Sequence, residues 1–409
     1  MKKIIKKFIP RFLLSFYHFL LAWLGAIIYS FPSKELTIIG TTGTNGKTTV
    51  VHLISEILEK TGNKVASISS IRFKINDKEW PNTLKMTMPG RFKIQKFFRD
   101  AVKAKCNYMV LEVTSEGIKQ YRHRFIEFDG AVFTNLTREH LEAHKGFENY
   151  KRAKGRLFKA LKKSKKKNKF SVINLDDLNA EYFLSFNIKK EYRYGIKNEE
   201  AEITPDKINL KISLPGEFNT YNALAAYCVG LSQNIETHKI LDIIKEFKGI
   251  PGRMELVIKK PFKVFVDYAH TPDALEKVYK TILSSERGSS LICVLGSCGG
   301  GRDKWKRPEM GKLANKYCSR IILTNEDPYD ENPEKILSDV ESGITYSSVN
   351  KILDRRQAIN KALRLAKEDD IVVITGKGNE PWMVVAGGRK ISWDDRKVAK
   401  EEFSKLFKD

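Results

Sequence analysis

Cysteine is scarce in this chain of 409 residues, which contains only five. None of the five forms a Cys-x-x-Cys pair, so neither a zinc ribbon nor a disulfide framework is indicated. Internal repeats and low-complexity tails are also absent from the sequence. Scattered free thiols are typical of a reducing compartment, and we therefore expect a cytoplasmic protein.

Acidic residues are too few to balance the basic ones, with 49 Asp and Glu against 73 Lys and Arg and a net charge of +24. Such a surface attracts phosphates, acidic substrates, anionic lipid or nucleic acid, although it also serves solubility alone. The apolar fraction of 42% and the charged fraction of 30% exclude a disordered chain and a membrane protein with many spans. The length predicts two or three domains.

The N-terminus holds the one long apolar run, from Phe12 to Phe31, after a start that contains four lysines and Arg11. A helix of this length would reach across a bilayer. The basic flank, however, would then place the rest of the chain outside the cell. We therefore expect a helix that lies on the inner face of the membrane, with a helix packed on the protein as the alternative.

Strand and helix patterns alternate along the rest of the chain, which predicts a doubly wound, mostly parallel α/β sheet. A Gly-Ile-Pro-Gly linker at 249–252 separates this part from a second, Rossmann-like α/β unit. We expect an N-terminal helix at 1–34, a central nucleotide-binding domain at 35–250 and a C-terminal domain at 251–409. The predicted strands are Leu36–Gly40, Lys64–Ser69, Tyr108–Val113, Ala131–Thr134, Phe170–Asn174, Val264–Asp267, Leu291–Leu295, Ile321–Thr324 and Ile371–Thr375.

A glycine-rich loop, GTTGTNGKTT at 40–49, follows the first strand and opens a helix. Glycines let backbone N–H groups turn toward phosphate oxygens, and the helix N-terminus adds partial positive charge. Lys47 can reach the β- and γ-phosphates, and the Thr48 hydroxyl can bind Mg²⁺. Thr41 stands where the strict phosphate-loop pattern has glycine. The residues predicted to hold the nucleotide here are Gly43, Thr44, Asn45, Gly46, Lys47, Thr48 and Thr49.

Metal-binding side chains follow two other strands. Glu112 ends a strand, where an acidic Mg²⁺ ligand belongs in an open α/β sheet. His140 and His144 follow another strand end together with two carboxylates, which favours a metal role over a structural one. The sequence therefore predicts an NTPase-type site with Lys47, Glu112 and His140 among its catalytic residues.

The chain resembles the Mur ligase family of ATP-dependent amide-forming ligases in peptidoglycan precursor synthesis, and within it the branch that adds the third residue of the stem peptide. The resemblance runs from about Leu36 to the C-terminus. Separate motifs occur in order: GTNGKTT at 43–49, EVTS at 112–115, TNL at 134–136, YKRAK at 150–154, FNTYN at 218–222, PGRME at 251–255, DYAHTPD at 267–273, the stretch 296–308, GKG at 376–378 and DDR at 394–396.

The resemblance assigns roles to matching positions. Glu112 and His140 would bind two Mg²⁺ ions together with Thr48. Lys154 matches the lysine that family members carbamylate with CO₂, which turns a cation that repels Mg²⁺ into an oxygen ligand. The remaining matches are Asn219, Arg253 and Asp267 near the nucleotide, Thr87, Ser115, Gln120 and Arg122 for the acidic sugar-peptide, and Arg302 and Glu380 for the incoming amino acid.

The implied reaction joins a UDP-linked muramoyl peptide to a free amino acid. The peptide carboxylate attacks the γ-phosphate of ATP, the amine attacks the resulting acyl phosphate, and phosphate leaves. Negative charge builds in both steps, so metal ions and Lys47 would stabilise them. We expect a single chain to carry out the reaction, with closure of the C-terminal domain excluding water.

Two departures from the family pattern bear on the substrates. About 35 residues precede the strand of the phosphate loop, where family members have a domain for the uridine nucleotide. We therefore expect either that the UDP group of the donor is bound differently or that the donor is lipid-linked. Ligases for diaminopimelate show Asp-Asn-Pro-Arg, but here the stretch is Glu326-Asp327-Pro328-Tyr329. Without that arginine the distal carboxylate loses its partner, and the acidic pair predicts a basic amino acid such as lysine or ornithine.

Two other functions stay open on the sequence. One is a different amide ligase of the same superfamily, of the folylpolyglutamate or cyanophycin type. The other is a membrane-associated or nucleic-acid-stimulated NTPase, which would use the net charge of +24 but leaves Lys154 and the second α/β unit unexplained.

Overall fold

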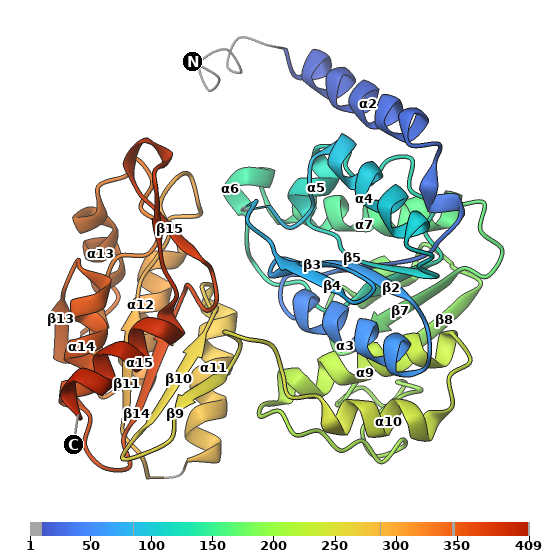
Figure 1. Cartoon of the computed structure of the whole chain (residues 1–409). Helices are drawn as coiled ribbons and strands as arrows, with labels where there is room; N and C mark the ends of the chain where they lie inside the picture. Colours follow the sequence, from blue (N-terminus) through green and yellow to red (C-terminus); the bar gives the residue numbers. More distant parts are fainter. Residues whose placement is uncertain (1–9, 85, 287, 346–347, 408–409) are drawn as a thin grey trace. The chain divides into compact units, whose positions relative to one another are not determined.

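The structure, a computed structural model, describes residues 10–84, 86–286, 288–345 and 348–407 (Figure 1). The lysines of the first nine residues lie outside these ranges. The chain forms two compact units. The first comprises Met1–Thr137, Phe147–Ser213 and Phe218–Phe247, and the second comprises Arg138–Gly146, Leu214–Glu217 and Lys248–Asp409.

An eight-stranded sheet forms the centre of the first unit, in the order β4-β3-β2-β5-β1-β6-β7-β8. From β2 to β8 in this order the neighbouring strands are parallel, and the hairpin of β3 and β4 adds an antiparallel edge. The central strands are buried on both faces, as apolar strands of parallel sheets are. The bounds are β1 (Thr37–Thr42), β2 (Val65–Ile68), β3 (Arg72–Ile75), β4 (Lys78–Pro81), β5 (Tyr108–Glu112), β6 (Gly130–Phe133), β7 (Phe170–Asn174) and β8 (Lys190–Tyr194).

Helices cover both faces of this sheet (Figure 1). Helices α3, α9 and α10 lie on one face, and α4, α5 and α7 lie on the other. The core between the sheet and the second group is rich in phenylalanine, including Phe98, Phe128 and Phe158. The bounds are α3 (Lys47–Lys60), α4 (Arg91–Lys103), α5 (Ser115–Lys119), α7 (Phe147–Lys163), α8 (Ala180–Leu184), α9 (Glu217–Ser232) and α10 (Thr237–Glu246).

The predicted apolar N-terminal helix is present as α2 (Arg11–Ile28), which lies against α4 and is followed by the short helix η1 (Pro32–Lys34). The predicted helix ran three residues further, to Phe31, but Ser30 and Phe31 adopt left-handed backbone conformations with φ of 55° and 50°, which ends it. Within the described part of the chain, we find no helix with the length and apolar content to cross a membrane.

The second unit is built on a six-stranded sheet in the order β13-β12-β11-β14-β10-β9, in which β9 alone runs antiparallel to its neighbour. A small hairpin of β15 and β16 forms a separate sheet. The strands are β9 (Glu255–Ile258), β10 (Lys263–Asp267), β11 (Leu291–Leu295), β12 (Arg320–Leu323), β13 (Ser348–Lys351), β14 (Ile371–Thr375), β15 (Trp382–Val384) and β16 (Lys390–Ser392). The helices are α6 (Leu141–His144), α11 (Pro272–Ser285), α12 (Lys306–Tyr317), α13 (Pro333–Glu341), α14 (Arg355–Leu365), η2 (Ala386–Gly388) and α15 (Asp395–Leu406).

The predicted fold class is confirmed by these two sheets, because each is mostly parallel and carries helices between its strands. Sequence signals mark several helix starts in the second unit. In α11, the Thr271 hydroxyl accepts a hydrogen bond from the N–H of Ala274, and Pro272 occupies the first helical position. The Asp354 carboxylate accepts in the same way from Gln357 at the start of α14.

A buried histidine in the first unit gives a stability prediction. Burial, and after it the positive charges of Arg124 and Arg156, lowers the pKa of His123 from 6.5 to about 3. As pH falls below 6.5, His123 therefore binds a proton in the unfolded chain but not in the folded chain. The free energy of unfolding then falls by up to about 1.4 kcal/mol per pH unit. We expect His123→Gln to remove this loss between pH 7 and pH 5, measured by urea unfolding at each pH.

The matched control for this prediction is His238→Gln, because the His238 side chain is 67% exposed. That variant should keep the pH dependence of the unaltered chain. Equal pH dependence of all three proteins would show that His123 does not carry the effect.

Candidate active site

The glycine-rich loop joins β1 to α3 and has a backbone that only glycine adopts readily. Gly43 and Gly46 have φ angles of +154° and +83°. A Cβ atom at Gly43 would overlap the Thr134 hydroxyl, and one at Gly46 would overlap the side-chain oxygen of Asn222 in α9. The loop is therefore packed tightly against the segment that follows β6 and against α9.

The segment after β6 holds this loop by hydrogen bonds. The N–H of Thr44 donates to the carbonyl of Asn135 at 2.8 Å, and the N–H of Asn45 donates to the Asn135 side chain at 2.9 Å. The Thr134 hydroxyl donates to the carbonyl of Asn45 at 2.7 Å. The first N–H groups of α3 have no acceptor within the helix, as at every helix start, and such a helix start favours the binding of an anion at this loop.

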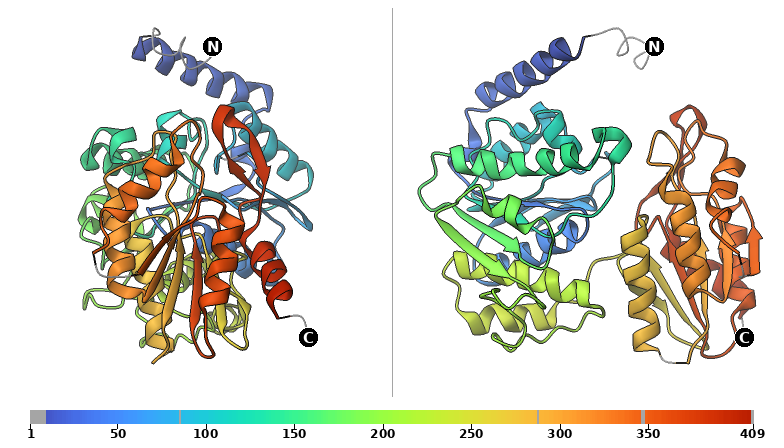
Figure 2. Two further views of the ribbon diagram at one scale, coloured as in Figure 1. Left: turned by 90° about the vertical axis from the view of Figure 1, so that its left-hand side faces the viewer. Right: turned by 180° about the vertical axis from the view of Figure 1, so that it is seen from behind.

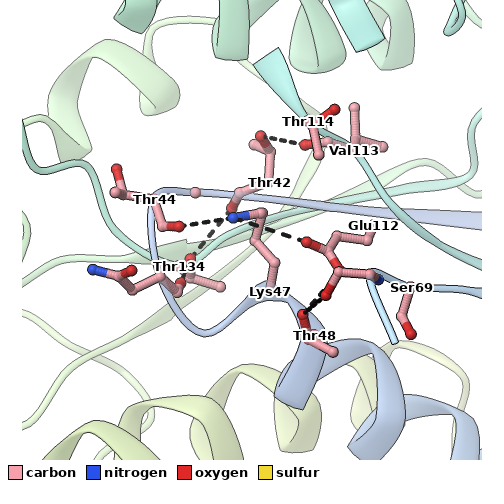
Figure 3. Close-up of polar contacts among 12 residues, drawn as sticks. Thr42, Thr44, Lys47, Thr48, Ser69, Glu112, Val113, Thr114 and Thr134 are labelled. Atoms are coloured by element: carbon pink, nitrogen blue, oxygen red, sulfur yellow. Dashed lines mark hydrogen bonds and ion pairs between the residues drawn. The ribbon is translucent and has the colours of Figure 1, made fainter. Parts of the chain in front are cut away.

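Lys47, Thr48 and Glu112 meet at the carboxyl ends of β1 and β5 (Figure 3). The Lys47 ammonium donates to the Thr44 carbonyl at 2.7 Å and lies 3.9 Å from the Glu112 carboxylate. The Thr48 hydroxyl donates to the same carboxylate at 2.9 Å. The register of the sheet explains this meeting, because Glu112 pairs with Thr41 on the adjacent strand.

This donor set fits a nucleoside triphosphate with Mg²⁺. The loop presents N–H groups and an ammonium to phosphate oxygens, while the Thr48 hydroxyl and the Glu112 carboxylate supply the oxygen ligands that Mg²⁺ prefers. No cluster of three or more His, Cys, Asp and Glu side chains suited to a metal ion occurs in the described ranges. The oxygen ligands that the first unit offers at this loop are the Thr48 hydroxyl and the Glu112 carboxylate, and a bound nucleotide would add its phosphate oxygens.

Lys154 comes to the same loop from α7. Its side chain is only 2% exposed, its ammonium donates to the Gly43 carbonyl at 2.5 Å, and it lies 4.4 Å from the centre of the Tyr150 ring. A buried lysine on a phosphate loop is far from the solvated surface position that a lysine-rich helix usually gives. The structure thus brings Lys154 together with Lys47, Thr48 and Glu112 around one loop.

His140 belongs to the second compact unit, whereas these four residues belong to the first. It precedes α6 in a left-handed conformation with φ of 56°, and its ring centre lies 6.5 Å from that of His144. Its neighbour Glu139 is buried and lies 3.4 Å from the Lys306 ammonium. Burial raises the pKa of Glu139, and Lys306 opposes that effect.

Residues predicted to hold the sugar-peptide gather around the start and end of α5. The Arg122 guanidinium donates to the Met88 carbonyl and, at 2.8 Å, to the Gln120 side chain. Ser115 is buried at the beginning of α5, which the Thr114 hydroxyl caps, and Thr87 is half-buried beside Met88. The four predicted residues therefore share one region of the first unit. Burial lowers the pKa of Arg122, and the positive charge of Arg91 adds to this.

Residues predicted to hold the incoming amino acid surround a buried lysine, Lys377, in the second unit. Its ammonium donates to Asp327 at 2.9 Å and to Glu380. Burial alone would lower the pKa of Lys377, but these two carboxylates outweigh it and raise the pKa. Glu326 is buried beside them and accepts from the Cys298 thiol at 2.7 Å. Asp327 is thus already paired, and among the described residues Glu326 Oε2 has no hydrogen-bond partner.

Arg302 lies in the same region, within the electrostatic reach of Cys298 and Tyr268. Two residues predicted to lie near the nucleotide, Arg253 and Asp267, belong to the same unit, and the charge of Arg253 acts on Asp267. The Arg253 guanidinium lies 4.1 Å from the centre of the Tyr268 ring, and the Tyr268 hydroxyl donates to Glu380 at 3.2 Å. Asp267 is buried, accepts from the N–H groups of Met254 and Ala269, and has its pKa raised by burial.

Several residues at these sites belong to the motifs named above, although no role was predicted for them. Asn135 bonds to the loop, Asn222 packs on Gly46 and accompanies the predicted Asn219, and Lys377 pairs with the acidic residues. Ser70 was missed entirely, although its N–H donates to Glu112 at 2.9 Å. The signal that could have found it is its place two residues after β2, the strand that neighbours β5.

Comparison with known proteins identifies the family. Residues 41–230 match the Mur ligase middle domain, and residues 252–378 match the domain described as "Mur ligase, glutamate ligase domain". The chain belongs to the Mur ligase family. The resemblance seen in the sequence motifs is thereby confirmed, and so is the predicted class of enzyme, an ATP-dependent ligase that uses Mg²⁺.

Relatives of this Mur ligase include UDP-N-acetylmuramoyl-L-alanyl-D-glutamate–2,6-diaminopimelate ligases. The protein from Bacillus cereus is 38% identical, over 93% of this chain and 81% of the relative. One from Clostridium acetobutylicum is 37% identical, over 95% and 82% respectively. A solved structure of such a ligase is 31% identical with a TM-score of 0.60, covering 91% of this chain and 79% of that one.

The fold extends to more distant ligases. A folylpolyglutamate synthase from Mycobacterium tuberculosis has a TM-score of 0.68 at 16% identity, with 87% of this chain and 92% of that one covered. At that identity the likeness shows the fold alone. The relatives at 37–38% identity therefore favour the muramoyl-peptide branch over the folylpolyglutamate alternative.

Proposed function

We propose that this Mur ligase adds the third residue to a UDP-N-acetylmuramoyl dipeptide and forms an amide bond with release of ADP and phosphate. The observation that carries the proposal is the convergence of Lys47, Thr48, Glu112 and Lys154 on one phosphate loop. The buried Lys154 ammonium beside Gly43 supports a role for this lysine in the phosphoryl chemistry of a ligase. The relatives named above are ligases that act on a muramoyl dipeptide, which supports the same reaction.

The chain's own residues suit a two-step transfer. The loop and Lys47 hold the γ-phosphate while the donor carboxylate attacks it, and the Lys47 charge stabilises the negative charge that builds on the oxygens. Arg122 and Gln120 orient the acidic donor. The amine of the incoming amino acid then attacks the acyl phosphate carbonyl, and phosphate leaves with the electron pair of the broken bond.

Thr48 and Glu112 are the residues that would hold Mg²⁺ in the first unit, and we propose that a carbamate on Lys154 joins them in a set for two ions. The metal supplies charge stabilisation at the phosphoryl oxygens. Carbamylation would replace the Lys154 ammonium by an anion directly beside Gly43, which removes a buried positive charge that would repel the metal.

For the incoming amino acid we propose a basic side chain. Tyr329 stands where ligases for diaminopimelate have arginine, and the buried Glu326 keeps one carboxylate oxygen without a partner among the described residues. A cationic side chain would satisfy that oxygen. Phosphate release compared with lysine, ornithine and diaminopimelate decides the question, and a strong preference for diaminopimelate would reject this acceptor.

The proposed reaction is tested by mass spectrometry of the product formed from ATP, the UDP-linked muramoyl dipeptide and each amino acid. We expect a tripeptide product only when all three reactants are present. ATP hydrolysis that needs neither donor nor amino acid would overturn the proposal. We also propose that a single chain is active and that the N-terminal helix gives it a peripheral contact with the inner face of the membrane.

A further inference from the structure

Helix α2 packs on the first unit with its smallest residues. Ala22 and Ala26 are 2% and 0% exposed, and Gly25 is buried between them. A Cβ atom at Gly25 would lie 3.3 Å from the Arg91 carbonyl and 3.4 Å from the Cα atom of Phe92. The backbone of α2 therefore approaches the beginning of α4 as closely as helices with small residues allow.

Polar contacts fix this helix in place at both ends. Near its beginning, the Ser15 hydroxyl bonds to the Tyr121 hydroxyl at 2.7 Å, and His18 Nδ1 lies 2.6 Å from the Arg91 guanidinium. At its end, the Arg99 guanidinium donates to the carbonyls of Tyr29 and Ser30 at 3.0 and 3.1 Å. The orientation of α2 is thus set by the fold of the first unit, and its outer face is a fixed feature of the molecule.

The outer face of α2 carries large apolar side chains. This arrangement is the reverse of an ordinary amphipathic helix, which buries its large residues. Of fourteen large apolar side chains that the described residues expose, α2 holds eight. Figures 1 and 2 show α2 along the outside of α4, with no other described element of the first unit over its outer side. Seven of these residues, Phe12, Leu13, Phe16, Tyr17, Trp23, Ile27 and Ile28, form the outer face of α2. The eighth, Phe19, lies at the edge of this face, where its ring packs against those of Tyr121 and Phe125.

The charge around the outer face of α2 indicates which partner it binds. Helix α2 contains no Asp or Glu, and α4 beneath it has five basic residues against one acidic residue. Four lysines precede α2 in the sequence, and the whole chain carries +24. A second copy would bring two equally basic surfaces together, whereas anionic lipid headgroups complement them. Trp and Tyr are the side chains enriched where hydrocarbon meets headgroups.

We propose that the outer face of α2 docks on an anionic lipid bilayer, with Phe16, Trp23 and Ile27 entering the boundary between headgroups and acyl chains. The fold, rather than the membrane, positions the helix for this contact. Arg91 links α2 to the donor region, because it also donates to the Gln120 carbonyl at 2.9 Å. Docking of α2 therefore brings the donor-binding residues around α5 to the membrane surface, a step that rests on the proposed function.

Flotation of the full-length chain with lipid vesicles tests this inference. We expect binding to vesicles of equimolar phosphatidylcholine and phosphatidylglycerol, much weaker binding to phosphatidylcholine alone, and loss of binding as salt is raised. The combined variant Phe16→Ser, Trp23→Ser and Ile27→Ser should lower the partition coefficient at least about tenfold. The combined variant Leu178→Ser, Leu353→Ser and Ile391→Ser alters three other exposed apolar residues and should bind like the unaltered chain.

Equal binding of the two combined variants to the vesicles would overturn the inference. It would also be overturned if light scattering showed that the unaltered chain is a dimer and that only the α2 variant is a monomer. The altered side chains of α2 are 42–62% exposed, so the variant should keep its thermal midpoint. Turnover with a soluble donor in lipid-free buffer is measured in parallel. Its absence in the unaltered chain would reject the proposed function and leave the vesicle result to stand by itself.

Discussion

Replacing Lys47 by alanine should lower the rate of amide formation by about a thousandfold, which corresponds to about 4 kcal/mol of lost transition-state stabilisation. The Lys47 ammonium lies in a site where Glu112 is almost fully buried, so water screens its charge poorly. No other side chain of the phosphate loop carries a positive charge. Both the transfer of the γ-phosphate and the collapse of the acyl phosphate place negative charge near it. Initial rates of phosphate release at saturating reactants measure the effect.

The control for this prediction is Lys60→Ala, at the far end of the same helix. The Lys60 side chain is 41% exposed and pairs with Glu56 and Glu246, contacts that add little to stability. This variant should keep the normal rate. A Lys47→Ala enzyme that works within about tenfold of the normal rate would show that the phosphate loop is not where the carboxylate is activated.

The catalytic half of the first unit could be predicted because its signals are local. The loop at 43–49 needs glycines at fixed positions. The apolar segments before the loop and before Glu112 predict buried parallel strands in an α/β chain. The register of β1 and β5 then follows from placing both strand ends at one edge of a sheet. Lys154 was found by a different route, through its family motif, because nothing local separates it from the lysines around it.

Other parts of the fold carry weaker sequence signals. Strand β4 is exposed along its whole length and lacks the apolar alternation that marks a strand, and β3 is only partly buried, so this hairpin was missed. The pairing of Lys377 with Asp327 joins residues fifty positions apart, which no spacing rule connects. The apolar run at 12–31 predicted a helix, but only the packing shows that Ala22, Gly25 and Ala26 face the protein while the large residues of the outer face of α2 face away.

Replacing Lys154 by arginine or by alanine should each lower the rate at least about a hundredfold. If Lys154 acts in catalysis as a positively charged ammonium, arginine would preserve the charge and part of the rate. If Lys154 acts as a carbamate, the arginine variant should lose as much of the rate as the alanine variant, because a guanidinium does not take up CO₂. The burial of Lys154 and its 2.5 Å contact with the Gly43 carbonyl place either form directly on the phosphate loop.

Labelled bicarbonate separates these two cases without relying on activity. The unaltered enzyme should show a ¹³C carbamate signal that is lost in both Lys154 variants, and its rate should fall in buffer freed of CO₂. Lys159→Ala is the matched control, because Lys159 lies on the exposed side of the same helix. It should keep both the signal and the rate. Full activity of the unaltered enzyme without CO₂ and without a carbamate signal would assign Lys154 to the phosphate loop as a simple cation, since its hydrogen bond to Gly43 would then be its whole role.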